Sequence, residues 1–226
     1  MRNLTSRALN YLKSLQRDPA AVTDKLEIEH YFLSQNIPIF ESVIDFGVRY
    51  SGVTLQAKNK KKDSFSALLV SSQDIETNRK YDFEKEGENF LFYCGNHETA
   101  QFYFYLNQLG QFCSDGYTGA NVLSSTFELK VEQYAYRNNL VEWIESPYYD
   151  LGETKELESI LKSGFEIIPE CSDDYNGWFV GDNIIIQKGV WLHGPTSYLH
   201  FFGKTNAALD KIVNHSENAG VIRKTG

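Results

Sequence analysis

The sequence is poor in the residues that mark oxidised, flexible or membrane-spanning proteins. Its only methionine is Met1, and its 226 residues include 3 cysteines and 5 prolines. Three widely spaced cysteines predict reduced thiols rather than a disulfide framework. No run of about 18 consecutive apolar residues occurs, so no membrane span is predicted. Because residues 1–18 lack an apolar core and a small-residue cleavage site, we predict no secretory signal and expect a cytoplasmic location.

The motifs that mark common catalytic sites are also missing. The sequence contains no G-x-S-x-G, no H-E-x-x-H and no phosphate-binding loop. None of the five histidines lies in a pattern that pairs it with a nucleophile or an orienting carboxylate. His193 is the strongest candidate, either as the base of a hydrolase of unrecognised type or as a hydrogen-bonded turn residue. We therefore expect a protein that is not an enzyme and holds no cofactor.

Metal-binding patterns are weak. Cys94 and His97 have a ligand-like spacing, but zinc needs three or four ligands and no second half is evident. Asp173 and Asp174 offer carboxylates for a hard cation, but their surroundings do not match an EF-hand loop. The sequence therefore predicts no metal site.

Aromatic residues, in contrast, are abundant. The chain holds 3 Trp, 14 Tyr and 15 Phe, which make up 14% of its residues. Rigid rings favour sheets more than helices, so a helical bundle is not expected. Helical periodicity comes first, then alternating strands, then a mixture, which is the α+β order. We predict N-terminal helices, a central antiparallel meander with a packed helix, and a strand-rich C-terminal elaboration.

The predicted elements follow from periodicity and turn residues. Within the second helix, spanning 22–36, we expect Val22, Leu26 and Leu33 to face inward. We expect Gly95 and Asn96 to turn the chain between two strands. The predicted helices cover 4–15, 22–36, 38–50, 127–135, 157–161 and 207–213, and the strands cover 53–56, 65–70, 90–94, 100–106, 165–168, 178–180, 184–186, 190–192 and 198–202.

Three finer expectations concern single side chains. Ser125 and Glu128 match a capping box that opens a helix. Tyr103 and Tyr105 alternate with phenylalanines, so their hydroxyls should lie at a wet rim. The polar tail from Ser216 should be frayed.

The negative charge is concentrated in one segment. The whole chain carries −8, and residues 141–182 alone hold eleven acids and two lysines, or −9. An acidic chain does not favour nucleic-acid binding, whereas a local excess suits a basic protein partner. The alternative is an ordinary solvated acidic surface. Acidic and aromatic residues interleave here, so we predict partner contacts at Glu145, Tyr148, Tyr149, Asp150, Asp173, Asp174, Tyr175 and Trp178. For Trp178, which lies in a strand pattern, a position in the core is the alternative.

Three stretches resemble one known family when taken together. They are residues 37–52 (IPIFESVIDFGVRYSG), the strand pair at 90–97 and 102–110, and the helix start at Ser124 and Ser125. Their order is similar to the SUKH superfamily of bacterial immunity proteins, which are related to a fungal cell-wall-assembly regulator. The resemblance covers residues 23–139.

This resemblance implies an α+β binding module without shared catalytic residues. We expect a SUKH-like core over 1–144, with 145–226 as an extension of the same domain or a small subdomain. The implied function is that of an immunity protein, which binds a cognate toxin and occludes its active-site surface. A regulatory scaffold that binds several proteins is the alternative. The oligomeric state is left open.

Overall fold

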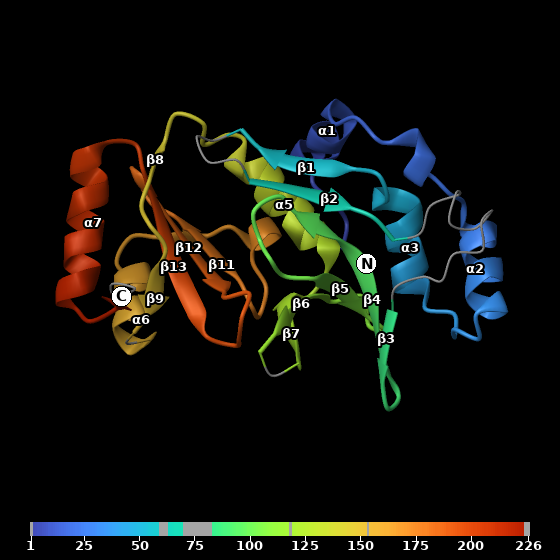
Figure 1. Cartoon of the computed structure of the whole chain (residues 1–226). Coiled ribbons are helices and arrows are strands. Elements are labelled where there is room, and N and C mark those ends of the chain that lie inside the picture. The colour runs from blue at the N-terminus through green and yellow to red at the C-terminus, as the bar shows by residue number, and fades with distance from the viewer. Residues whose placement is uncertain (1, 59–62, 70–82, 118, 153, 224–226) are drawn as a thin grey trace.

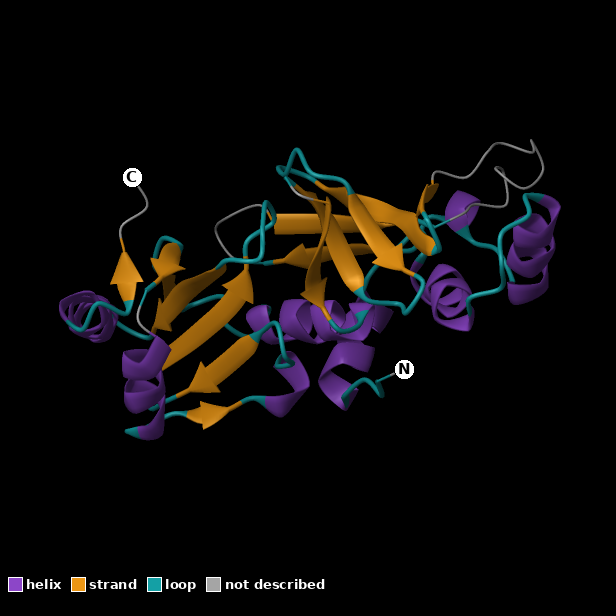
Figure 2. Cartoon of the chain, turned by 90° about the horizontal axis from the view of Figure 1, so that it is seen from below, coloured by secondary structure: helices purple, strands orange, loops and turns teal. Residues whose placement is uncertain are grey.

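The computed structural model describes the whole chain except residues 1, 59–62, 70–82, 118, 153 and 224–226. It shows an α+β fold with two antiparallel sheets, which confirms the predicted class. The sheets lie side by side, and helix α5 packs on the first sheet and reaches the second where the two meet (Figures 1 and 2). No helix in the described part is long and apolar enough to cross a membrane.

Three helices and one short 3-10 turn open the chain, and the three helices correspond to the predicted ones. They are α1 (Ser6–Ser14), the short 3-10 turn η1 (Pro19–Ala21), α2 (Lys25–Ser34) and α3 (Glu41–Tyr50). Helix α2 begins at Asp24, whose side chain accepts from the Glu27 N–H in a capping box.

The predicted inward face of α2 is wrong. Leu26 and Leu33 are 74% and 61% exposed, whereas Ile28, Tyr31 and Phe32 are buried. The helix carries apolar residues on two faces, so periodicity alone does not choose between them. Packing selects the aromatic face, where Phe32 stacks on Phe92 of the first sheet with ring centroids 5.5 Å apart.

The first sheet is a meander whose strands follow the order β1-β2-β4-β5-β6-β7, with β3 paired to β4. Its strands are β1 (Thr54–Ala57), β2 (Asp63–Ala67), β3 (Phe83–Glu86), β4 (Asn89–His97), β5 (Phe104–Asn107), β6 (Phe112–Gly116) and β7 (Gly119–Ser124).

The turn predicted at Gly95 and Asn96 is wrong, because both residues lie inside β4. The register between β4 and β5 shifts between Tyr93 and Gly95, as in a β-bulge. Gly95 has φ +143°, and a Cβ there would meet the Ser66 carbonyl oxygen at 2.1 Å. Glycine is therefore needed for close approach of two strands rather than for a reversal of the chain.

Of the two tyrosines predicted at a wet rim, only Tyr103 is exposed. Tyr105 is 6% exposed and packs with Leu91 and Cys113 on the face of the sheet opposite the main core. Its hydroxyl bonds the carboxylate of Glu84 at 2.9 Å. Both faces of this sheet thus bury apolar area, which strict alternation does not predict.

Helix α5 (Phe127–Arg137) packs on the first sheet, as expected, but its cap differs. The N-cap is Thr126, whose side chain accepts from the Leu129 N–H, rather than Ser125. Glu128 does not return to the cap. Instead it is buried and bonds Arg49 at 3.0 Å and the Tyr50 hydroxyl at 3.2 Å.

The second sheet has the order β10-β11-β12-β13-β9-β14, with β8 paired to β13. Its elements are β8 (Ile144–Glu145), β9 (Tyr149–Leu151), α6 (Thr154–Lys162), β10 (Glu166–Ile167), the 3-10 turn η2 (Pro169–Cys171), β11 (Gly177–Val180), β12 (Ile184–Val190), β13 (Ser197–Gly203), α7 (Asn206–Asn218) and β14 (Ile222–Arg223).

The predicted fraying from Ser216 is wrong over residues 216–223, and residues 224–226 lie outside the described part. Helix α7 continues to Asn218, Ser216 is 1% exposed, and Val221 and Ile222 are buried. Ile222 pairs with Leu151 as the last strand of the sheet. The segment is mostly polar, but its two apolar residues, Val221 and Ile222, pack into the core beneath α6 and α7.

The two faces of the second sheet have different roles. Ile186 and Phe201 face the core under α6 and α7, while Ile185 and Phe202 face α5 together with Trp178. The N-terminus also reaches this half, since Arg7 pairs with Glu170 at 3.2 Å. The chain passes from the first sheet to the second between α5 and β8, near residue 144.

Candidate functional site

The residues predicted to contact a partner do not form one surface. Trp178 is fully buried and stacks on Phe202 at 5.8 Å, and Tyr149 is 9% exposed in the core with Phe201. Both lie at inward positions of their strands. Their prediction as surface contacts is therefore wrong for this fold.

Glu145 and Tyr148 point into the space between the two sheets. The Glu145 carboxylate lies 3.8 Å from Arg137 and 3.7 Å from the His200 ring nitrogen. Tyr148 stacks on His200 with centroids 4.2 Å apart. These two side chains belong to the interior site described below.

Most of the remaining predicted contacts are held by hydrogen bonds. Asp150 accepts from the indole N–H of Trp191 at 2.8 Å. Asp173 accepts from the backbone N–H groups of Ser125, Tyr175 and Asn176 at 2.6–2.9 Å. The Tyr175 hydroxyl accepts from Gln111 at 3.4 Å. Of the eight side chains, only that of Asp174 is exposed.

A cavity of about 410 Å³ lies where the two sheets meet at α5. This volume is within the range of sites that hold small molecules, roughly 300–1,000 Å³. Its walls combine rings with a few polar groups, and they come from both sheets and from α5. Among the lining residues are Asp63, Phe65, His97, Phe102, Phe104, Phe112, Leu123, Lys130, Gln133, Tyr134, Arg137, Tyr148, Trp178, Gln187, Val190, Trp191, His193 and Tyr198.

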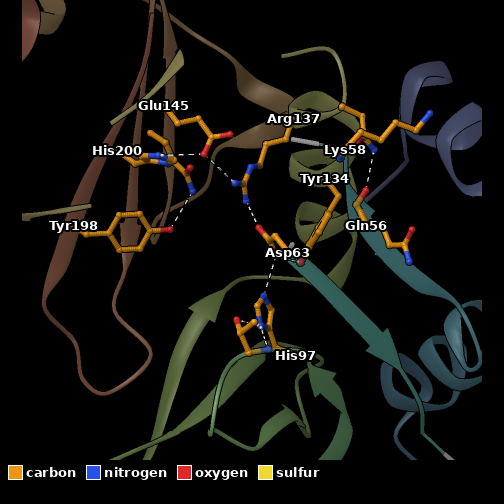
Figure 3. A network of polar contacts seen from close by, with 12 residues as sticks. Gln56, Lys58, Asp63, His97, Tyr134, Arg137, Glu145, Tyr198 and His200 are labelled. Atoms are coloured by element: carbon orange, nitrogen blue, oxygen red, sulfur yellow. Dashed lines mark hydrogen bonds and ion pairs between the residues drawn. The ribbon is translucent and has the colours of Figure 1, made fainter. Parts of the chain in front are cut away.

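Asp63 is the centre of a polar network in this cavity (Figure 3). Its carboxylate accepts from the Tyr134 hydroxyl at 2.6 Å and from His97 Nε2 at 2.9 Å, and it pairs with Arg137. The Thr99 N–H donates to His97 Nδ1 at 3.3 Å, which leaves the ring proton on Nε2. The network then continues through Arg137 to Glu145.

The charge state of Asp63 follows from these contacts. Burial alone would raise the pKa of its carboxyl group. The hydrogen bond from His97 and the charges of Arg137 and Lys130 outweigh burial and hold the pKa well below its usual range. Asp63 is therefore ionised at neutral pH, and its charge is balanced by Arg137.

Lys130 is the second cation of the cavity, and it has no such partner. Its ammonium lies 5.2 Å from the Tyr134 ring centroid and 5.8 Å from that of Phe112. Within the described ranges, no carboxylate lies at ion-pair distance from it. Burial lowers the pKa of Lys130, while the charge of Asp63 opposes this shift.

His193 and Cys94 take no part in the polar network of Asp63, whereas His97 does. His193 is exposed at the cavity wall, near the rings of Trp191 and Tyr117, and no described carboxylate pairs with it. Cys94 is fully buried, and burial raises the pKa of its thiol. No group of three or more potential metal ligands occurs among the described residues.

Sequence reasoning missed the cavity residues other than Tyr148, Trp178, His97 and His193. One local signal was available: Lys130, Tyr134 and Arg137 recur on one face of α5. Asp63 and Gln187, which line the same cavity, lie in strands of different sheets. No sequence pattern over a few residues connects them with the helix.

Comparisons with protein-family models, curated proteins and solved structures gave no match to this chain.

Proposed function

We propose that this chain is a binding protein of the immunity type, which neutralises a cognate toxin by covering a basic surface at its active site. The order of helix, meander and capped helix that resembles SUKH proteins supports this assignment. The observation that carries it is the set of exposed carboxylates over residues 141–182. Binding occludes the toxin without any turnover by this protein.

Among the described residues of this segment, six acidic side chains are exposed, and five of them form no described ion pair. The exception, Glu158, lies 3.7 Å from Lys162, and both side chains are largely exposed, so this pair contributes little. Uncompensated surface carboxylates attract a cationic protein and speed encounter. The six residues are Glu142, Glu156, Glu158, Glu166, Asp174 and Asp182.

The edge strand β10 offers a docking point for a partner among these exposed acids. Ile167 is 55% exposed on β10, next to the exposed Glu166. The turn of the β11–β12 hairpin brings Asp182 to the same edge, since Gly181 lies against Phe165. An apolar side chain flanked by acids suits a basic interface that buries a small apolar centre.

Co-expression with the product of the adjacent upstream gene tests the proposal directly. We expect that product to stop growth alone and this chain to restore growth. If the product is harmless, or remains toxic beside this chain, the proposal fails. A solitary locus without a toxin neighbour would instead favour the regulatory scaffold.

Charge reversal tests the acidic surface separately. Glu166→Lys combined with Asp182→Lys should raise the dissociation constant at least about tenfold and weaken its salt dependence. Asp210→Lys on α7 is the control, since it reverses an exposed charge outside the acidic segment. Equal affinity of all three proteins would remove the acidic surface from the mechanism while leaving neutralisation itself intact.

A further inference from the structure

Two cations, Arg137 and Lys130, lie at the cavity where the two sheets meet. Arg137 pairs with Asp63 and also lies 3.8 Å from the carboxylate of Glu145. Lys130 lies against aromatic rings, with no described carboxylate at ion-pair distance. Lys130 is partly buried, and a partly desolvated ammonium without an ion-pair partner favours a guest that carries a negative charge.

The remaining walls fit a flat apolar body. Phe104 and Phe112 stack with their rings only 4° apart, 5.5 Å between centroids. Phe102, Leu123 and Trp191 extend this apolar lining. Phe104 and Phe112 are only 2% and 1% exposed, so they form the floor of the cavity. The partly exposed rings of Phe102 and Trp191 offer the faces that favour a planar guest.

A second observation shows that the polar side of the cavity wall is not saturated. Trp178 and Gln187 line the cavity and are 0% and 6% exposed. Neither the indole N–H of Trp178 nor the side-chain oxygen of Gln187 has a hydrogen-bond partner among the described residues. Buried polar groups are normally satisfied, and exceptions cluster where a guest or water completes the site.

We propose that this cavity binds a small organic anion with a planar apolar body, whose anionic group lies at Lys130 and whose body lies against the phenylalanine and tryptophan rings. This site is separate from the acidic surface at β10, so its failure leaves the proposed function untouched. A side chain of a bound protein partner is a different occupant, and the experiment below distinguishes it.

Two fluorescent probes that share one aromatic body allow a direct test on the purified chain. Anilinonaphthalene sulfonate carries an anionic group, and phenylnaphthylamine is its uncharged counterpart. We expect the sulfonate to bind about tenfold more tightly, since a charge-assisted contact is present in only one of them. Equal affinity for both probes, or no binding of either, would overturn the proposal; the second result leaves a partner's side chain as the occupant.

Substitutions test where the anionic group and the aromatic body of the probe bind. Lys130→Met should cost the sulfonate about tenfold in affinity and leave phenylnaphthylamine unchanged. Lys85→Met is the matched control, because its ammonium also lies over a ring, 5.1 Å from that of Phe90, but outside the cavity. Val190→Phe narrows the cavity and should weaken both probes.

Lys130→Arg, which keeps the charge, should retain sulfonate binding within about threefold of wild type. Circular dichroism and a thermal scan confirm that each variant is folded before its affinity is compared. Unchanged sulfonate binding in a folded Lys130→Met protein, or unchanged binding of both probes in a folded Val190→Phe protein, would refute the assignment.

Discussion

Asp63 should stabilise the junction between the two sheets more than any exposed acid of the chain. Asp63→Asn keeps the shape of the side chain and removes the charge that balances Arg137, whose side chain is only 10% exposed. Breaking a buried ion pair by changing one partner costs about 3–5 kcal/mol. Glu145 stays 3.8 Å from Arg137 in this variant, so we expect the lower end, about 3 kcal/mol. For a chain of this size, that loss lowers the melting temperature by roughly 6–12 °C.

The pH dependence of the free energy of unfolding tests the role of Asp63 independently. The pKa of Asp63 is lower in the folded chain than in the unfolded one. Its stabilisation is therefore fully present above the unfolded pKa, about 3.9, and is lost as the pH falls through the folded pKa. Wild type should lose stability below about pH 4, and Asp63→Asn should show a flatter dependence in that window.

Urea unfolding followed by tryptophan fluorescence measures both effects. Asp174→Asn is the control, because this carboxylate is exposed and has no described partner. The double variant Asp63→Leu, Arg137→Met should be less destabilised than the sum of its single changes, since neither charge is left alone. A free energy of unfolding for Asp63→Asn within about 0.5 kcal/mol of wild type would refute the role given to this network.

Two further predictions test the packing. Leu26→Ser on the exposed face of α2 should change stability by less than about 0.5 kcal/mol, whereas Phe32→Ala should cost about 3–5 kcal/mol, as judged by urea unfolding; the reverse order would restore the face predicted from periodicity. Burial raises the pKa of the Cys113 and Cys171 thiols to about 12 and that of Cys94 well above its usual value, so a thiol-reactive dye at pH 8 should label all three only in denaturant, and fast labelling of the native chain would contradict their burial.

Local patterns gave the order and type of most elements. Helices α1, α3 and α6 lie close to their expected ranges, and the hairpin β11–β12 turns at Gly181 as expected. These features depend on side-chain period, proline and glycine, whose effects act over a few residues. Helix α2 carries apolar residues on two faces, and its sequence alone does not determine which face is buried.

The errors in placing single residues have a common cause. The sequence predicts Gly95 in a turn because glycine is common in turns. In the structure, the neighbouring strand β2 lies so close to Gly95 that no side chain would fit there. Trp178 was expected at a surface because acids surround it in sequence, but alternation within β11 directs it inward. Both outcomes depend on which strand lies beside which, and pairing partners are distant in sequence.

By itself, the sequence determined the α+β class, the aromatic core and the concentration of negative charge in residues 141–182. Only the tertiary structure decided which of those acids are exposed and which are held inside. It also decided the cavity, since Asp63, Lys130 and Gln187 come from two sheets and the helix between them. A charge count is additive along the chain, whereas a site requires side chains from distant segments to meet, and strand pairing and packing on α5 bring them together.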